Sequence, residues 1–440
     1  MKASVSALAC VSFLAFLLAS CTSVSHYQAI DEAVARGDYS SGLEELRGAK
    51  EQAYKPKDQV LYYLDEGMLA HYAGDYKESS QSLGTAERAI ELAVTKSVSM
   101  EVSSYLVNDN SLEYPGEDYE DIYLNVFNSL NYYYSGSIEG ALVEVRRIDN
   151  KIKYLSTKYG GAITNAQKAI MDKSSEIPYD SEAATIKFSN SALGRYLGML
   201  LYRSEGKFDD ARIDRDQVKL AFANQPSLYG FPLPKALDEE LSVPRGKARL
   251  NVISFSGLSP VKTESVIRIG LGSSNWLKIA VPVITYRKSE VSSVRLRVDG
   301  FDPVELDLLE DMGAVAMETF KQKAALIYLK TVLRSLAKTS SSMIMEEQAN
   351  ETSNADAALL LSVLSIGTQI YAEASEQADL RLSRYFPSKA HVAGVTLDPG
   401  VYSWTIEYLD AGGNVLHSVR NENREIRSNA LNLSEAVCIR

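Results

Sequence analysis

Residues 63–89, YLDEGMLAHYAGDYKESSQSLGTAERA, decide the fold of the first half of the chain. Apolar residues at helical spacing flank a turn at Gly74. We expect Gly74 to end the first helix in a left-handed conformation, which glycine adopts without the cost that a side chain imposes. Gly67 would allow close approach of the second helix, and Tyr76 would fill the gap between the two helices. The segment therefore predicts an antiparallel helical hairpin.

The same pattern recurs in three other segments, which are 35–49, 127–148 and 197–218. Their turn glycines are Gly37, Gly136 and Gly206. Along the chain, successive turn glycines are 37, 62 and 70 residues apart, so an array of such hairpins carries insertions at about 93–118 and 150–190. The alternative is an irregular helical bundle in which the glycine turns are coincidental.

The four segments resemble the tetratricopeptide repeat (TPR), although Ser79 replaces the usual alanine and Arg215 occupies a usually apolar position. The resemblance implies stacked helix pairs with a concave inner surface that binds peptides or proteins. The first helices of the second and third pairs are rich in tyrosine, which offers a large contact area and a polar tip. Any single tyrosine also fits a packing role. We expect the partner-binding groove to contain Tyr63, Tyr72, Tyr132, Tyr133 and Arg146.

A basic stretch, VEVRRIDNKIK at residues 143–153, contains Arg146, Arg147 and Lys151. Residues four apart share a helix face, so these cations form a stripe. The stripe either pairs with Glu117 or Asp121 of the preceding helix or binds a carboxylate of a ligand.

The second half of the chain alternates apolar and polar residues with the period of β-strands. Prolines at residues 226–245 mark a linker or a wrapped connection before it. Strand patterns occupy residues 248–310 and 391–426, with turns at Asp299-Gly300 and at Pro-Gly and Gly-Gly. We expect one sheet system, similar to a β-sandwich, interrupted by a helical insertion at about 311–385.

The insertion is expected to form two helices, 312–349 and 355–384, joined by a polar turn. The second contains sixteen uncharged residues, AALLLSVLSIGTQIYA, which is short for a membrane span. Packing against the first helix explains it, and an oligomerisation or membrane contact is the alternative. The predicted fold is thus α+β: a TPR-like helical array over 21–225, a linker over 226–245 and a β-rich region over 246–440.

The amino terminus has the features of a secretory signal. Lys2 precedes an apolar run from Ala7 to Leu18 that is too short to span a membrane. The run ends in Leu18-Ala19-Ser20-Cys21, which resembles a bacterial lipobox. The resemblance implies cleavage after residue 20, acylation of Cys21 with chains such as palmitate, and a stable lipid anchor. Residue 22 is threonine and not aspartate, so the resemblance also implies attachment to the outer membrane, with the protein facing the periplasm.

The net charge and the cysteines limit the partners. The chain has a formal charge of −11, and loss of Lys2 with the signal leaves −12. Such an acidic chain does not suit nucleic acid as a ligand. Without Cys10, only Cys21 and Cys438 remain, and an acylated Cys21 forms no disulfide. Cys438 is expected to lie in a C-terminal tail.

The segment EYPGEDYEDIY at residues 113–123 places four carboxylates within five positions, at Glu117, Asp118, Glu120 and Asp121. Pro115-Gly116 suggests a turn, and acids are favoured in the first turn of a helix because free N–H groups point at them. We therefore expect a helix to begin here. The alternatives are an acidic contact with a partner and a metal-binding or catalytic cluster.

Motifs of known catalytic chemistry are missing from the sequence. The four histidines lie in separate elements, no glycine-rich phosphate loop follows a strand, and no nucleophile elbow is present. We therefore predict no enzyme activity, no catalytic residue, no metal site and no cofactor. A pair of carboxylates facing a cleft would leave no such motif.

The lipobox, the divergent repeats and the segments YPGEDYED, ALVEVRR, GKARLNVISFSG and EQADLR together resemble a family of bacterial TPR-containing lipoproteins. The resemblance implies a membrane-anchored adaptor that binds a protein partner of the cell envelope, with envelope or peptidoglycan assembly as its setting. A periplasmic carrier or sensor of small ligands is the alternative. An envelope hydrolase using acids of 109–121 is a third.

Overall fold

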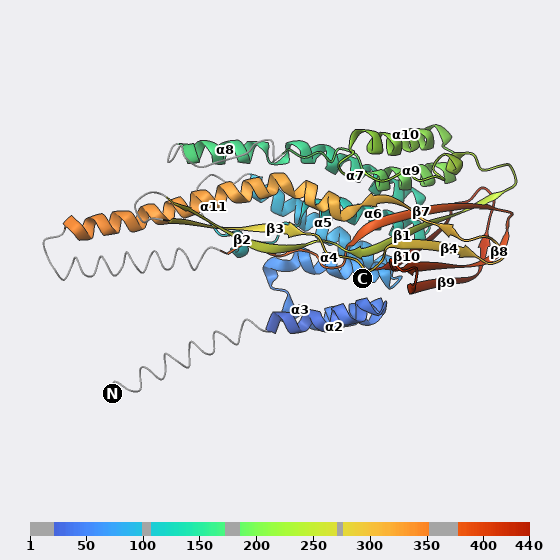
Figure 1. Cartoon of the computed structure of the whole chain (residues 1–440), viewed down its shortest axis with the longest axis horizontal. Coiled ribbons are helices and arrows are strands. Elements are labelled where there is room, and N and C mark those ends of the chain that lie inside the picture. Colours follow the sequence, from blue (N-terminus) through green and yellow to red (C-terminus); the bar gives the residue numbers. More distant parts are fainter. Residues whose placement is uncertain (1–21, 99–106, 172–184, 271–275, 352–376) are drawn as a thin grey trace, which may run out of the picture.

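A computed structural model of the chain describes residues 22–98, 107–171, 185–270, 276–351 and 377–440. The first half is helical and the second half is built from β-sheets with an inserted helix, as the sequence predicts (Figure 1). The helices of the first half are α2 (Thr22–Ala35), α3 (Tyr39–Ala53), α4 (Gln59–Tyr72), α5 (Tyr76–Val98), α6 (Asp118–Tyr134), α7 (Ile138–Lys158), α8 (Gly160–Met171), α9 (Ala192–Ser204) and α10 (Phe208–Asn224).

All four predicted turn glycines separate two helices and have positive φ. The angles are 77° at Gly37, 83° at Gly74, 83° at Gly136 and 71° at Gly206. This confirms the four helical hairpins, α2–α3, α4–α5, α6–α7 and α9–α10.

The second hairpin also confirms the close approach at Gly67. A Cβ atom at this position would lie 2.6 Å from the side chain of Leu83 in α5. The neighbouring Ser79, which stands where the repeat usually has alanine, donates a hydrogen bond of 2.7 Å to the carbonyl oxygen of Gly67. The serine therefore satisfies its buried hydroxyl across the same helix contact.

Two four-stranded sheets and a separate hairpin form the second half. The strand orders are β10-β1-β7-β6 and β5-β4-β8-β9 for the two larger sheets, and β2-β3 for the hairpin. The strands are β1 (Ala248–Leu258), β2 (Val261–Gly270), β3 (Trp276–Thr285), β4 (Ser293–Val298), β5 (Val304–Glu305), β6 (Asp307–Asp311), β7 (Pro387–Leu397), β8 (Gly400–Leu409), β9 (Val415–Ile426) and β10 (Asn432–Cys438). The expected single sheet system is thus divided, because β2 and β3 pair only with each other among the described strands.

The two four-stranded sheets bury one face each in a shared apolar cluster. Leu250 and Val252 of β1 meet Leu296 of β4 and Ile406 of β8 there. Burial of such side chains contributes about 1.5–3 kcal/mol each. The alternating pattern of the sequence therefore produces two sheets that face each other.

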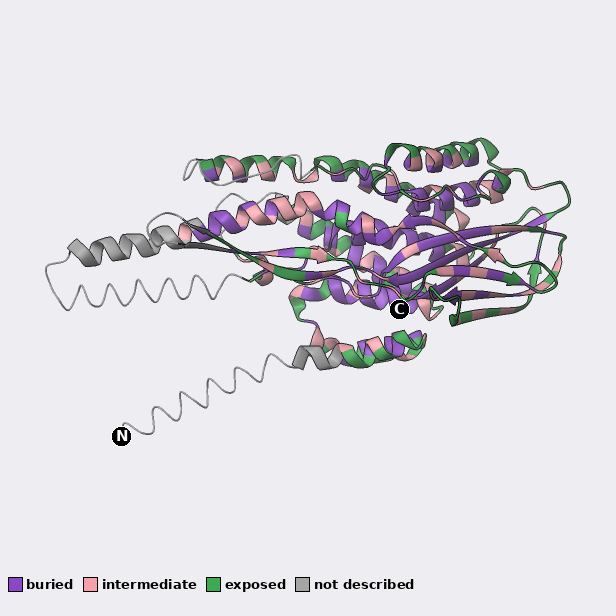
Figure 2. Ribbon diagram, in the orientation of Figure 1, coloured by how far each residue is buried: buried purple, intermediate pink, exposed green. Residues whose placement is uncertain are grey.

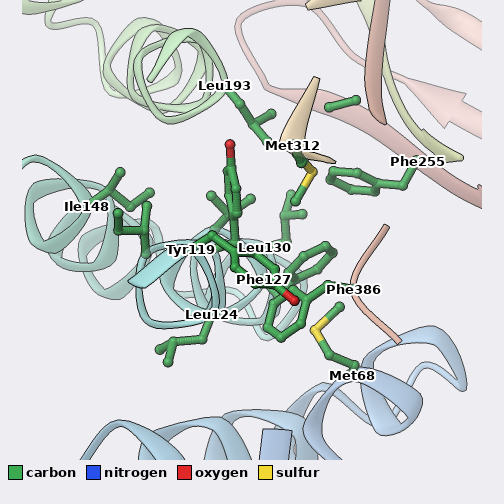
Figure 3. Close-up of a cluster of buried hydrophobic side chains, with 14 of the residues drawn as sticks. Met68, Tyr119, Leu124, Phe127, Leu130, Ile148, Leu193, Phe255, Met312 and Phe386 are labelled. Carbon is green, nitrogen blue, oxygen red and sulfur yellow. The ribbon is translucent and has the colours of Figure 1, made fainter. Parts of the chain in front are cut away.

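The opposite face of the first sheet packs directly on the helices. Phe127 of α6 lies 5.0 Å from Phe255 of β1 and 6.0 Å from Phe386, measured between ring centroids. Figure 3 shows these rings between α4, α6 and the sheet, together with Met68 and Met312. Buried residues concentrate along this contact in Figure 2, whereas α8 and α10 are mostly exposed. Helices and sheet therefore share one core.

Buried carboxylates strengthen the contact between the halves. Asp65 of α4 accepts hydrogen bonds from the hydroxyl of Ser383 and the N–H of Arg384. Glu310 of β6 accepts from the hydroxyl of Tyr123 in α6 at 2.5 Å and from the N–H of Leu193 in α9. A buried carboxylate is stable only when such donors replace water, so these bonds fix the halves against each other.

The proline-rich segment 226–245 wraps against the helices. Leu228, Tyr229 and Leu237 are buried in the main core, and the hydroxyl of Tyr229 donates to Glu310 at 2.7 Å. Of the two forms expected for this segment, the wrapped connection is the one observed.

The inserted helix is α11 (Met312–Glu351), which matches the first predicted insertion helix. It packs with α8 and β3 through Ile170, Ile279, Leu329 and Leu333, and these elements extend toward one end of the molecule (Figure 1). Most of the second predicted helix lies outside the described residues. Its last part, residues 377–384, is not helical, so the prediction that this helix continues to residue 384 is wrong.

The C-terminal residues form a strand where we expected a tail. β10 pairs in parallel with β1, with Asn432 opposite Leu250 and Cys438 opposite Ser256. Cys438 is only 2% exposed. Within the described ranges, no helix combines the length and the apolar character of a membrane span.

Candidate functional site

Two of the five predicted groove residues contact the β-rich half of the same chain. The hydroxyl of Tyr72 donates to the carbonyl of Tyr385 at 2.9 Å. The hydroxyl of Tyr133 donates to the carbonyl of Leu431 at 2.7 Å and accepts from the N–H of Leu433 at 3.3 Å. The tyrosine-bearing face that we expected to be open is thus covered by β10 and the segment before β7.

The other three predicted residues lie elsewhere. Tyr63 is half-buried, with its ring 5.3 Å from that of Tyr62. Tyr132 is 36% exposed and packs over Gly140, and Arg146 is exposed on α7. The five side chains therefore do not converge on one surface.

Where the helix ends meet the last strands, the structure contains a cavity of about 530 Å³. This volume is in the range typical of ligand pockets. Tyr72 and Tyr133 line it, and so do aromatic residues that the sequence analysis did not select. The other aromatic and charged lining residues are His71, Tyr76, Tyr134, Trp404, Arg424, Glu425, Arg427 and Glu435. We call this space the β10 cavity.

His71, at the end of α4, links the helices to β10 at the wall of the β10 cavity. Its Nε2 lies 2.7 Å from Oε1 of Glu435, and its Nδ1 lies 2.6 Å from Oδ1 of Asn131. The amide N–H of Asn131 donates a hydrogen bond to the hydroxyl oxygen of Ser79. The hydroxyl of Ser79 in turn donates to the carbonyl oxygen of Gly67. Both ring nitrogens of His71 therefore face acceptors, as in a protonated imidazolium.

The surroundings of His71 favour its charged form. Burial by itself lowers the pKa of His71, but the charge of Glu435 and the hydrogen bonds to Glu435 and Asn131 outweigh it and raise the pKa above its usual value. The position in the last turn of α4 acts in the same direction, because the helix C-terminus favours a cation. The contact between His71 and Glu435 is thus a buried ion pair whenever His71 is protonated.

Several polar atoms at the cavity have no hydrogen-bond partner among the described residues: Oε2 of Glu435, the hydroxyl of Tyr134 and Nδ2 of Asn421. Burial and the charge of Glu435 raise the pKa of Tyr134 well above its usual value, so its hydroxyl keeps its proton. The ring of Tyr134 stacks on Tyr76 with centroids 4.6 Å apart and an interplanar angle of 20°. Buried polar atoms normally find partners, and all three of these residues line the β10 cavity.

The rim of the β10 cavity carries opposite charges on the end of β9 and the following turn. Nε of Arg427 lies 2.8 Å from Oε2 of Glu425. Arg424 is exposed and makes no ion pair with any residue that the structure describes. Arg424 is thus a cation at the rim that remains available to a ligand.

The acidic segment at residues 113–123 starts a helix, as predicted. α6 begins at Asp118, and Glu117 and Glu120 form a capping box in which the Glu120 carboxylate accepts the N–H of Glu117 at 2.7 Å. Burial, and secondarily the charge of Glu117, raise the pKa of Glu120 to about 7.

The other three acids at residues 117–121 are paired with cations from different elements. Glu117 binds Lys262 of β2 at 2.5 Å and Lys323 of α11 at 2.8 Å. Asp118 binds Lys158 at 2.6 Å, and Asp121 binds Lys151 at 2.7 Å. The carboxylates therefore point in several directions and serve packing, and no group of three or more potential ligands for a metal ion occurs among the described residues.

The basic stripe on α7 is partly used in internal pairs, the first of the two roles expected for it. Lys151 pairs with Asp121 and with Glu87, and Arg147 pairs with Glu87 at 2.6 Å. Arg146 points to solvent. Internal pairing thus accounts for the inner part of the stripe.

No local sequence pattern indicates that His71 and Glu435 form a pair at the cavity. His71 and Glu435 are 364 residues apart in the chain, and Glu435 lies in a strand that was expected to be a tail. Only the tyrosine-rich ends of α4 and α6 pointed to this region.

Comparisons with protein-family models, with curated proteins and with solved structures found no match to this chain. The geometry of the chain itself therefore carries the functional argument.

Proposed function

We propose that the protein is a lipid-anchored binding protein of the bacterial cell envelope that holds a protein partner at the β10 cavity. The helical hairpins with left-handed glycine turns at Gly37, Gly74, Gly136 and Gly206 support a TPR-like array. The two sheets that share one core support a β-sandwich. On this proposal the sandwich closes the inner face of the array and leaves the cavity as the binding site.

The anchor in this proposal is the acylated Cys21, which lies outside the described residues. Attachment to the outer membrane would place the folded chain in the periplasm, close to proteins of envelope and peptidoglycan assembly. Several acyl chains bind a bilayer stably, so the folded part needs no membrane contact of its own.

The observation that carries the binding role is the composition of the cavity wall. Tyr72, Tyr76, Tyr133 and Tyr134 surround the buried His71–Glu435 pair in a space of about 530 Å³. Aromatic walls with a few placed polar groups are typical of recognition sites, and tyrosine is enriched at protein interfaces. The acids at residues 117–121 and at residue 310 are engaged in ion pairs or hydrogen bonds within the chain, which favours binding over hydrolysis.

Photo-crosslinking in the native envelope tests this function. A photoreactive amino acid in place of Arg424, at the cavity rim, should crosslink a discrete partner that mass spectrometry identifies. The matched control places the same group at Tyr154, which is 50% exposed on α7 and not part of the cavity. Equal crosslinking from both positions, or none from Arg424, would contradict the proposal.

A carrier of small ligands is the second candidate, and the volume of the cavity favours it. The insertions at 93–118 and 150–190, which were expected to close such a pocket, contribute no residue to the described wall. Native mass spectrometry of protein extracted from its own envelope distinguishes the two: a bound small molecule of constant mass supports the carrier, and a bound protein supports the adaptor.

A further inference from the structure

The C-terminal strand β10 is an edge strand. In its sheet, with the order β10-β1-β7-β6, β10 pairs on one side with β1 and has no described strand on the other. An edge strand presents a row of N–H and C=O groups that are available to another extended chain. Proteins usually cover such an edge or interrupt it with proline or lysine, and β10 contains neither.

The side-chain contacts show which backbone groups of β10 point away from β1. Tyr133 bonds the carbonyl of Leu431 and the N–H of Leu433, and the hydroxyl of Tyr39 donates to the carbonyl of Val437 at 3.3 Å. These are alternate residues, as expected when every second residue faces the same edge. By the same alternation, both backbone groups of Glu435 face this edge.

Between the two tyrosine contacts the edge is unpaired. The carbonyl of Leu433, the N–H and carbonyl of Glu435 and the N–H of Val437 have no hydrogen-bond partner among the residues that the structure describes. The β10 cavity lies along this segment, since every residue from Leu431 to Val437 lines it. The cavity thus borders two donors and two acceptors at the spacing of an extended chain.

We infer that the β10 cavity binds an extended peptide segment of the partner, which adds to the free edge of β10 as a further strand. This inference rests on the proposed function and specifies its ligand. Main-chain hydrogen bonds to Leu433, Glu435 and Val437 supply affinity, as in other cases of strand addition. Tyr133 and Tyr39 bond the backbone at either side of the free segment and so limit the added strand to it.

Side chains at the cavity determine which peptide sequences bind. The stacked rings of Tyr76 and Tyr134 offer a surface for an apolar or aromatic side chain of the peptide. The exposed guanidinium of Arg424 complements a carboxylate. The ligand is therefore an extended segment with an aromatic or apolar residue and an acidic residue.

A peptide selection tests the mode of binding. A random library of 12-residue peptides is screened on the full-length chain in detergent micelles, and the best binder is resynthesised with a single N-methyl group at each backbone position in turn. Strand addition predicts at least a tenfold loss of affinity at alternate positions and little change at those between them. Equal losses at all positions, or no binding peptide at all, would overturn the inference.

Amide hydrogen exchange gives an independent readout with an internal control. On addition of the selected peptide, exchange at the amides of Glu435 and Val437 should slow by tenfold or more. The amides of Ser434 and Ala436, which face β1, should keep their rates. Unchanged exchange at Glu435 and Val437 would show that the peptide binds elsewhere.

The role of Arg424 is tested with a matched variant on the same strand. R424A should lower the affinity for the acidic peptide by about tenfold. R420A should leave this affinity unchanged, because Arg420 is an exposed arginine that pairs with Asp299 outside the cavity. Equal effects of the two variants would overturn the role of Arg424. If a partner still crosslinks from position 424 but the N-methyl scan shows no alternation, the proposed binding function stands. Only the mode of binding by strand addition is then rejected.

Discussion

The Nε2 atom of His71 lies 2.7 Å from Oε1 of Glu435, and this buried pair joins helix α4 of the helical half to the last strand of the sheet. The side chain of His71 is 1% exposed and that of Glu435 is 11% exposed. The ion pair is therefore shielded from water, and its effect on stability depends on the proton that His71 carries.

We expect the contribution of the His71–Glu435 pair to the stability of the fold to fall as the pH rises. Burial lowers the pKa of His71, but Glu435 and Asn131 raise it more, so the folded-state pKa lies above the unfolded value. Such a group stabilises the fold fully below its unfolded pKa of about 6.5 and loses this effect as the pH passes the folded pKa. H71Q should cost about 1.5–3 kcal/mol at pH 6 and less at pH 9, measured by urea unfolding. An equal cost at both values would contradict the charged pair.

The carboxyl group of Glu120 gives a second pH effect of the same sign. Burial raises its pKa to about 7, so ionisation is disfavoured in the folded state. Stability from this group is present below its usual pKa and is lost as the pH rises toward 7 and beyond. Relative to E120Q, the wild-type protein should lose about 3 kcal/mol between pH 4 and pH 8. A difference in unfolding free energy that does not change over this range would refute the raised pKa.

The close contact between α4 and α5 predicts the effect of a single methyl group. G67A would place a Cβ atom 2.6 Å from Leu83, so we expect a loss of about 1–3 kcal/mol from overpacking. Gly48 in α3 is exposed, and a Cβ atom added there would meet no other atom within 4 Å, so G48A should stabilise the protein by about 0.5–1 kcal/mol. Thermal unfolding of both variants checks the contrast, and similar effects would argue against a tight contact at Gly67.

The features predicted from sequence are those set by local rules. The turn glycines, Gly37, Gly74, Gly136 and Gly206, were found because a left-handed helix end favours glycine. The strands up to β9 were found from their period of two or, at β3, from a continuous apolar run. β10 was missed because the stretch NLSEAVC is short and only partly alternating, and a parallel pairing with β1 depends on residues about 180 positions away. The local pattern of apolar and polar residues does not show which distant strand β10 pairs with.

The candidate site was only partly visible for the same reason. Tyr72 and Tyr133 were selected for their residue type and their place on the first helix of each hairpin, and both line the cavity. The sequence does not show that the sheet folds back onto that face, since the contact of Phe127 with Phe255 joins segments 128 residues apart. The sheet consequently covers much of the groove that was expected to be open and leaves the β10 cavity.

The proposed lipid anchor at Cys21 predicts a change of location without a change of fold. C21S should prevent acylation, so the protein should appear in the soluble fraction of the envelope and lose incorporation of a labelled fatty acid. The matched control is C438S, because Cys438 is buried in β10 and should keep the label. Label retained in C21S would place the acyl chain on another residue.

Tyrosine hydroxyls between the halves predict that helices and sheets unfold together. Y72F and Y133F each remove hydrogen bonds to the β-rich half, at Tyr385 and at Leu431 and Leu433, so each should cost about 0.5–1.5 kcal/mol. Y132F changes a hydroxyl on an exposed ring over Gly140 and should cost little. Because the halves share one core, circular dichroism and tryptophan fluorescence should report the same urea midpoint in every variant. Two separate midpoints in the wild-type protein would instead indicate that the helical array and the sheets fold independently, and the tyrosines would then be free to meet a partner.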